Sequence, residues 1–281
     1  MSFLGVIKEN NNYVNKGKIP FFVNNKRVGQ IRKEYLQFFL LNKIFLFKDG
    51  VLSLTKELKT FEERTKALYG FAKEICSNDY FNCSFRDEKY PLMEKSYDTP
   101  LAFIDRSISP LLGSISFGQH LNAYVVTSKG MKMWIGRRAS NKLYDAGKLD
   151  QLVAGGLPYD IPSYKNLIKE CYEEAAISED LLSEVKSVGI VSYKNEGMLG
   201  GKENIILCYD LELSEDFVPK CIDGEVEEFY LMDIEEVVEN VLTPNKFKGN
   251  CNLVVIDFLV RHGYITPQNQ DYIEIVRTLR S

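Results

Sequence analysis

The amino-acid sequence predicts an α/β protein whose larger part is an α/β/α sandwich built on a mixed sheet. In the second part of the chain, short apolar strands surround one helix and are followed by two more helices, an order typical of a sheet covered on both faces. The first part mixes short segments and predicts a smaller α+β domain. A chain of 281 residues has room for one or two domains. We place the boundary near the turn-forming Pro110 and Gly113, which gives residues 1–112 and 113–281.

Local patterns predict the elements of the first domain. Residues 19–31 are typical of two strands around an Asn-Asn turn, which is a hairpin signal. Residues 34–42 are apolar at helical spacing. Thr60 followed by Glu63 is a capping-box pattern, and it predicts the start of a helix that runs to Cys76.

The second domain is predicted from apolar runs of strand length and from helical periodicity. Its predicted strands are residues 122–127, 131–137, 151–154, 188–193, 205–213 and 228–232, and its predicted helices are residues 162–176, 234–241 and 250–262. The third strand runs directly into Gly155 and Gly156. Gly263 supplies the cap that ends the last helix.

Composition argues against several classes of partner. The net charge is −4, and the basic doublet Arg137-Arg138 is too small for the concentrated basic face of a nucleic-acid binder. No apolar run suits a signal peptide or approaches the roughly 18 residues of a membrane helix, so we expect a cytoplasmic protein with no membrane partner. The six cysteines lack paired spacing and are expected to be reduced thiols rather than zinc ligands. The oligomeric state has no signature in the sequence.

Three acidic residues on the helix of residues 162–176 point to metal chemistry. Glu170, Glu173 and Glu174 are spaced i, i+3 and i+4, so they share one helix face. Like charges this close destabilise a helix unless a cation compensates, and magnesium prefers carboxylate oxygen. Such a run alone is more often a solvated acidic face. The preceding Gly-Gly turn favours a metal site, because glycine lets the backbone approach a ligand closely.

These residues resemble the signature of the Nudix hydrolase family, G-x5-E-x7-R-E-U-x-E-E-x-G-U, in which U is aliphatic. Counted from Gly155, the chain matches the first glycine, Glu170, the pair Glu173-Glu174 and the final aliphatic Ile177. The resemblance implies a diphosphate hydrolase whose metal is held by the glutamates.

Four positions depart from that signature: Ile161 replaces the first Glu, Lys169 the Arg, Cys171 the aliphatic residue and Ala176 the second Gly. In the family, the Arg and the early Glu brace the loop against the helix, and lysine is a weaker bidentate partner. Asp160 could pair with Lys169 instead. The glutamates are intact, so we expect an active enzyme rather than a catalytically weakened diphosphate-binding protein.

A closer resemblance covers nearly the whole chain. The runs LVAGGLP, KECYEEA, DGEVEEF and VVIDFLVRHG, together with ERTKALYGF, FRDEKYPL and FIDRSISPLLG in the first domain, are similar to a fungal and plant Nudix subgroup with an extra N-terminal domain. In some fungi this subgroup is fused to thiamine pyrophosphokinase. The resemblance implies hydrolysis of thiamine diphosphate analogues, especially oxidised forms such as oxothiamine and oxythiamine diphosphate, to the monophosphate and phosphate. Nucleoside diphosphate derivatives are the alternative substrates.

Roles follow for the acidic residues. We expect Glu170 and Glu174 to bind Mg²⁺ (or Mn²⁺) directly and Glu173 to do so through water. The general base could be one of these three or a downstream acid. The downstream candidates are Glu225, Glu227 and Glu228, which could equally be surface charges.

The remaining candidates are substrate-binding residues. Gly155, Gly156 and Lys169 flank the proposed metal site, and Arg137 or Arg138 could clamp the diphosphate, although strand alternation points one of them away. In the first domain, Arg86 belongs to a polar and aromatic group with Asp87, Glu88 and Tyr90, and Asp105-Arg106 form another. These two groups could line the organic half of the pocket or hold the domains together.

Overall fold

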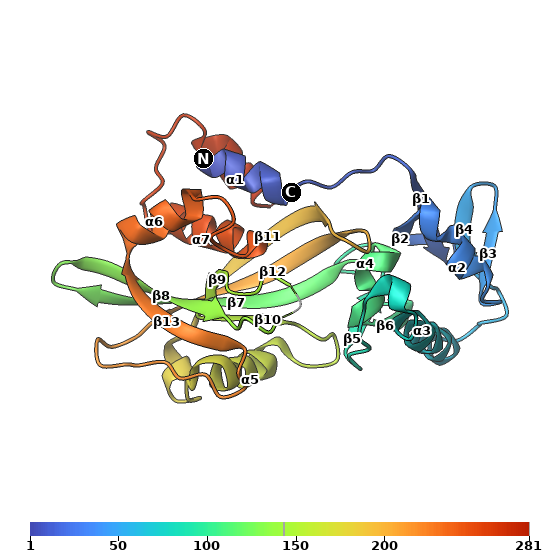
Figure 1. Cartoon of the computed structure of the whole chain (residues 1–281), viewed down its shortest axis with the longest axis horizontal. Coiled ribbons are helices and arrows are strands. Elements are labelled where there is room, and N and C mark those ends of the chain that lie inside the picture. Colours follow the sequence, from blue (N-terminus) through green and yellow to red (C-terminus); the bar gives the residue numbers. More distant parts are fainter. Residues whose placement is uncertain (143, 281) are drawn as a thin grey trace.

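The first part of the chain forms a four-stranded sheet, a two-stranded sheet and a long helix. The computed structural model describes residues 1–142 and 144–280 (Figure 1). The elements of this part are β1 (Lys18–Val23), β2 (Lys26–Arg32), α2 (Leu36–Leu40), β3 (Phe45–Lys48), β4 (Val51–Leu54), α3 (Phe61–Cys76), β5 (Lys89–Leu92), β6 (Ala102–Asp105), a short 3₁₀ helix (Arg106–Ile108) and α4 (Ser109–Leu112). The larger sheet has the order β2-β1-β4-β3, and β5 pairs with β6. An α+β organisation is therefore confirmed here.

Two local sequence signals of this part are confirmed. Asn24 and Asn25 have φ values of +49° and +62°, the left-handed geometry of tight turns between twisted antiparallel strands. Thr60 Oγ1 accepts a hydrogen bond from the Glu63 N–H at 3.1 Å, and the Glu63 carboxylate accepts one from the Thr60 N–H at 2.9 Å. The capping box thus fixes the start of α3 from its own sequence.

The second part is built on a mixed seven-stranded sheet. Its main order is β11-β12-β7-β8-β13, with β10 pairing β7 and β9 pairing β8. The strands are β7 (Ser116–Thr127), β8 (Gly130–Arg138), β9 (Leu149–Gln151), β10 (Val153–Gly156), β11 (Lys186–Glu196), β12 (Gly201–Glu212) and β13 (Val226–Asp233). Strand β12 runs parallel to β7 and the other pairs are antiparallel. The predicted mixed sheet is confirmed.

Helices cover both faces of this sheet. The helices are α5 (Ser163–Ala175) on one face and α6 (Ile234–Leu242), α7 (Gly249–Arg261) and α8 (Tyr272–Thr278) toward the other (Figure 1). Side chains alternate along β7, so that Ala123 and Val125 pack in the core with α5 while Tyr124 contacts Phe258 of α7. The α/β/α sandwich is confirmed. None of the helices in residues 1–142 and 144–280 is long and apolar enough to cross a membrane.

Two features differ from the expectation. The single strand predicted at residues 151–154 is two short strands, because the chain changes neighbours at Leu152: β9 pairs with β8, and β10 pairs with β7. An unpredicted helix, α1 (Phe3–Asn10), packs Leu4, Val6 and Ile7 into the core that contains α7 and α8. The first residues of the chain therefore complete the sandwich, not the N-terminal sheet (Figure 1).

The β11–β12 hairpin holds the two parts together. Arg32 of β2 pairs with Glu196 at 2.9 Å and donates a hydrogen bond to the Met198 carbonyl. Leu199, at the tip, is buried in the hydrophobic core of the N-terminal part. This hairpin and the N-terminal part together form one wall of the site described below.

Candidate active site

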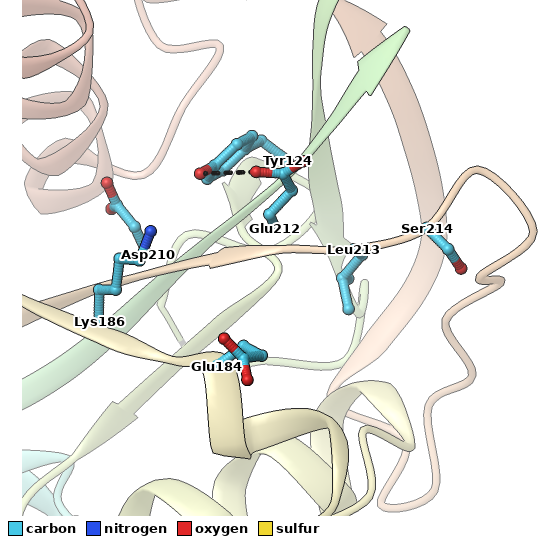
Figure 2. Close-up of a pocket in the computed structure, with 7 residues that line it drawn as sticks. All are labelled: Tyr124, Glu184, Lys186, Asp210, Glu212, Leu213 and Ser214. Carbon is cyan, nitrogen blue, oxygen red and sulfur yellow. Dashed lines mark hydrogen bonds between the residues drawn. The ribbon is translucent and has the colours of Figure 1, made fainter.

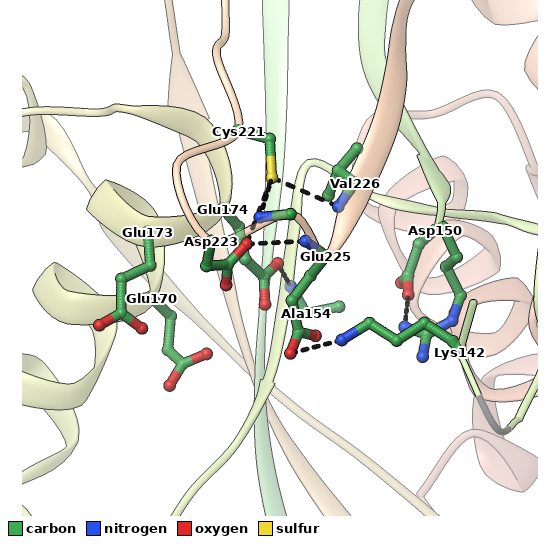
Figure 3. Close-up of polar contacts among 12 residues, drawn as sticks. Lys142, Asp150, Ala154, Glu170, Glu173, Glu174, Cys221, Asp223, Glu225 and Val226 are labelled. Atoms are coloured by element: carbon green, nitrogen blue, oxygen red, sulfur yellow. Dashed lines mark hydrogen bonds and ion pairs between the residues drawn. The ribbon is translucent and has the colours of Figure 1, made fainter. Parts of the chain in front are cut away.

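The carboxylate of Glu174 is buried against strand β10. Glu174 is 6% exposed, and its Oε2 accepts a hydrogen bond from the Ala154 N–H at 2.9 Å (Figure 3). No lysine or arginine of the described residues pairs with it within 4.0 Å. Burial raises the pKa of Glu174 to about 8. A carboxyl group in this setting ionises most readily when a cation binds beside it.

Gly155 brings the backbone of β10 against a second carboxylate. A Cβ at this position would overlap Glu170 Oε2, so a side chain here would displace the Glu170 carboxylate from the strand. Burial raises the pKa of Glu170, and the neighbouring Lys169, 3.2 Å from Glu170 Oε1, partly offsets that effect. Glu170 and Glu174 thus form a pair of hard oxygen donors beside the glycine strand.

The third predicted ligand lies apart from this pair. Glu173 is 37% exposed at its side chain and pairs with Lys169 at 2.9 Å, on the side of α5 that faces away from Ala154 (Figure 3). Neighbouring residues on a helix are rotated by about 100°, so Glu173 and Glu174 cannot both face Ala154. The glutamates do not form a cluster whose ligand atoms all lie within 4.8 Å of one another among the described residues. The structure brings together Glu170 and Glu174 and leaves Glu173 and Lys169 outside.

The brace between the glycine loop and α5 differs from the one we suggested. Asp160 pairs with Lys89 of the N-terminal part at 2.7 Å, so the suggested Asp160–Lys169 pair is wrong. Asn166, which is 1% exposed, forms the brace instead. Its side-chain amide donates hydrogen bonds to the Gly156 carbonyl at 3.0 Å and to Gln119 Oε1 at 2.8 Å. A neutral amide network replaces the expected ion pair.

The departure at Ala176 has a structural meaning. Ala176 caps α5 with a φ of +53°, the left-handed conformation in which glycine carries no steric cost. An alanine there costs about 1 kcal/mol. The helix end keeps its geometry, since the Ile177 N–H still donates to the Cys171 carbonyl at 3.1 Å.

A cavity of about 650 Å³ lies over the glycine loop, between the two parts of the chain. The N-terminal part supplies Cys83, Ser84, Arg86, Glu88, Tyr90, Arg106, Ser107 and Pro110 to its lining. The second part supplies residues that include Ser116, His120, Arg138, Lys142, Ala154, Gly155, Gly156, Tyr193, Lys202, Glu225 and Lys248. Predicted substrate-binding residues Arg86, Arg138, Gly155 and Gly156 therefore meet around one cavity. Lys202 had no distinguishing signal in the sequence.

Strand alternation separates the two neighbouring arginines. Arg138 lines the cavity and pairs with the buried Asp150 at 3.0 Å. Arg137 is not among the lining residues; its guanidinium lies 3.4 Å from Glu227 and 3.1 Å from Glu228. Arg137 and these two glutamates are thus engaged with one another outside the cavity.

Glu225 is the downstream acid that reaches the cavity. The loop before it is anchored on α5, because the N–H groups of Ile222 and Asp223 donate to the Glu173 carbonyl at 2.8 and 3.2 Å. Figure 3 shows the Glu225 carboxylate near Ala154, where it pairs with Lys142 at 2.6 Å. Glu225 and Ala154 therefore line the same cavity.

Another acidic group under the cavity is already neutralised. His120, Asp150 and Cys251 have ligand atoms within 4.8 Å of one another. Asp150, however, pairs with Lys248 at 3.1 Å and with Arg138, and burial raises the pKa of the Cys251 thiol well above its usual value. The cluster is balanced by basic side chains without a metal ion. Burial also lowers the pKa of His120 to about 4, so its imidazole is neutral.

A second cavity of about 340 Å³ shares no lining residue with the first (Figure 2). It is lined by Tyr124, Glu184, Lys186, Asp210, Glu212, Leu213 and Ser214. Its most buried acid, Asp210, pairs with Arg261 and with His262, the latter at 2.9 Å. These contacts give the buried Asp210 carboxylate a structural role in the fold.

Comparisons with known proteins agree with this geometry. A family model described as Domain of unknown function (DUF4743) matches residues 2–115. Nudix hydrolase 20, chloroplastic, and Nudix hydrolase 24, chloroplastic, both from Arabidopsis thaliana, are each 40% identical to this chain, over 276 and 267 residues. Each alignment covers 94% of this chain and 73% of the relative. The chain belongs to the Nudix hydrolase family.

Among solved structures, this Nudix hydrolase is similar to the NUDIX domain of Shewanella oneidensis NrtR, complexed with ADP ribose. The two share 13% identity with a TM-score of 0.40, over 51% of this chain and 88% of the other. Nudix hydrolases generally use divalent metal ions. The residues present here fit such an ion: Glu170 and Glu174 offer oxygen donors, Glu174 has no basic partner within 4.0 Å in residues 1–142 and 144–280, and a Cβ at Gly155 would fill the space beside them.

Proposed function

We propose that this Nudix hydrolase is a magnesium-dependent diphosphatase that converts oxidised or otherwise altered thiamine diphosphate analogues to the monophosphate and phosphate. One observation carries the proposal. The buried carboxylate of Glu174 and the half-buried carboxylate of Glu170 lie against strand β10, whose Ala154, Gly155 and Gly156 line a cavity. The lining of this cavity includes six lysine and arginine side chains and three acidic ones. The carboxylates can hold a metal cation, and the lysine and arginine side chains can hold an anion. The site therefore suits a metal-bound diphosphate.

Different residues would have different roles in hydrolysis of the phosphoric anhydride bond. Glu170 and Glu174 would hold Mg²⁺ (or Mn²⁺), which supplies positive charge at the phosphoryl oxygens and makes water more acidic. Glu225 is our candidate for the base that accepts a proton from the attacking water, because its carboxylate reaches the cavity beside Ala154. Arg138 and Arg106 line the cavity and could neutralise charge on the phosphates. The anhydride oxygen leaves with its electron pair on one phosphate, and water supplies the hydroxyl group of the other.

The organic half of the substrate is inferred from sequence resemblance and is consistent with the cavity. The side chains of Tyr90, Phe117, Tyr144 and Tyr193 give it flat apolar surfaces that suit a heteroaromatic ring. These faces belong to both parts of the chain, so the N-terminal part would help select the substrate. We expect the enzyme to act in the cytosol, although the two plant relatives carry the description chloroplastic.

A panel of diphosphates tests this proposal. With Mg²⁺, kcat/KM for oxothiamine and oxythiamine diphosphate should exceed that for ADP-ribose and other nucleoside diphosphate derivatives by at least about tenfold, or 1.4 kcal/mol in the transition state. The same reactions in EDTA should release no phosphate. A tenfold preference for nucleotides would overturn the thiamine assignment. Tight binding of every analogue without product would identify a weakened diphosphate-binding protein, and a large gain of rate in Ile161→Glu would support that outcome.

A further inference from the structure

Lys202 is a cavity-lining cation with no acidic partner. It lies at the start of β12, directly after the hairpin tip that packs on the N-terminal part. Its ammonium donates to Ser116 Oγ at 3.3 Å, and no carboxylate of the described residues lies within 4.0 Å of it. The neighbouring acids are occupied, Glu196 by Lys18 and Arg32 and Glu203 by Lys194. The protein itself thus leaves this charge unbalanced.

A second cation, Arg106, lines the same cavity and acts on the charge of Lys202. Burial and, to a smaller extent, the positive charge of Arg106 lower the pKa of Lys202 to about 8. Keeping two like charges in a partly enclosed space is unfavourable unless an anion joins them. Both side chains line the same cavity. Their arrangement therefore favours a bound oxyanion.

Arg106 links this place to the metal-binding loop. It belongs to the N-terminal part, yet its Nη1 lies 2.7 Å from where a Cβ of Gly156 would stand, so it packs directly on the glycine loop. Glu88 holds it at 3.0 Å, and Tyr90 lies under the guanidinium at 5.8 Å from the ring centre. Arg106 is 44% exposed at its side chain and keeps donors free for a ligand. The cations thus extend from the glycine loop toward the hairpin.

We propose that Lys202 and Arg106 together bind one phosphate group of the substrate at the junction of the two parts, which makes the N-terminal part a component of the substrate site. The identity of the ligand as a diphosphate rests on the proposed function. The pair itself rests on the absence of a neutralising acid beside Lys202 among the described residues and on the shared cavity wall. The other possibility for Lys202 is a structural one, in which its bond to Ser116 stabilises the fold.

Binding of inorganic pyrophosphate in EDTA, measured by calorimetry, separates these possibilities without turnover or metal. The variant Lys202→Met should weaken pyrophosphate binding at least about tenfold, while Lys202→Arg should retain it. Lys194→Met is the matched control, because Lys194 lies on the adjacent strand, pairs with Glu203 at 3.1 Å and does not line the cavity. Thermal unfolding of each variant accompanies the titrations.

The stability readout distinguishes a ligand-binding lysine from a structural one. Removing an unbalanced charge should leave Tm unchanged or raise it in Lys202→Met, whereas a structural lysine would lower it. Pyrophosphate affinity within twofold of the unmodified protein would overturn the inference, even if turnover of thiamine analogues is observed. Conversely, weakened binding in Lys202→Met together with no turnover by the unmodified protein would sustain this inference and reject the proposed function.

Discussion

Two groups of opposite charge at the site, here called the carboxylate wall and the cationic wall, have different origins. The carboxylate wall consists of Glu170 and Glu174, which lie within a few residues of each other on α5 and contact strand β10 rather than the cavity itself. The cationic wall joins Arg106 and Lys202, which are far apart in sequence and come from different parts of the chain. The first wall is a local motif, whereas the second exists only because the hairpin docks on the N-terminal part.

Each wall nevertheless contains one charge that the protein does not balance. Burial raises the pKa of Glu174 to about 8 and lowers the pKa of Lys202 to about 8, so both groups are shifted toward their neutral forms. A metal ion would restore the charge of the first and a phosphate that of the second. The comparison predicts that damage to the carboxylate wall affects chemistry, while damage to the cationic wall affects binding.

The largest expected effect is the loss of turnover in Glu174→Gln. Glutamine keeps the size and the hydrogen bond from Ala154 but removes the proposed anionic metal donor, so kcat should fall by about 10³-fold or more. The control is Glu173→Gln, because Glu173 pairs with Lys169 outside the cavity and should lose less than about tenfold. Equal losses of kcat in the two variants would indicate that Glu173 is also a metal ligand. That result would contradict a site formed by Glu170 and Glu174 alone.

A smaller effect is expected for Glu225, which lines the cavity from the loop before β13. Glu225→Gln removes the candidate base without changing a metal donor, and kcat should fall by about 10²-fold with KM little changed. Glu227→Gln is the matched control, since Glu227 is bound by the Ser140 N–H at 2.7 Å and by Arg137. A rate for Glu225→Gln close to that of the control would exclude Glu225 as the base.

The smallest effect concerns stability without metal. The folded-state pKa of Glu174 is raised from 4.5 to about 8, so its favourable contribution is complete below about pH 4.5 and is lost as pH rises through 8. In EDTA the unmodified protein should therefore lose at least about 1 kcal/mol relative to Glu174→Gln between pH 5.5 and pH 8.5. Urea unfolding of both proteins at these two pH values measures the difference. Parallel pH dependence would show that Glu174 is not desolvated in solution.

Elements set by neighbouring residues could be predicted from the sequence. The Asn24-Asn25 turn and the Thr60–Glu63 capping box depend on contacts within a few residues, and α5 was expected at residues 162–176 and forms at Ser163–Ala175. The carboxylate wall could be predicted from the sequence for the same reason. Helical spacing also placed Glu173 on the acidic face, but spacing alone could not show that Lys169 engages it.

Long-range contacts account for what the sequence could not show. Asn166 replaces the expected Asp160–Lys169 brace because Gln119, on a distant strand, supplies its partner. Lys202 has no motif around it, and its importance appears only once Arg106 is known to face the same cavity. A sequence pattern records which charges are present; it does not record which of them stay unpaired after folding.

The packing of α1 has a consequence for how the polypeptide is made. Leu4, Val6 and Ile7 are synthesised more than 200 residues before their partners on α7 and α8. Until α7 and α8 have been made, this apolar stretch has no native surface to cover it, which is a long-range closure of the kind that slows folding and invites aggregation. A fragment starting at residue 113 would lack α1 and expose the apolar surface on which Leu4, Val6 and Ile7 pack.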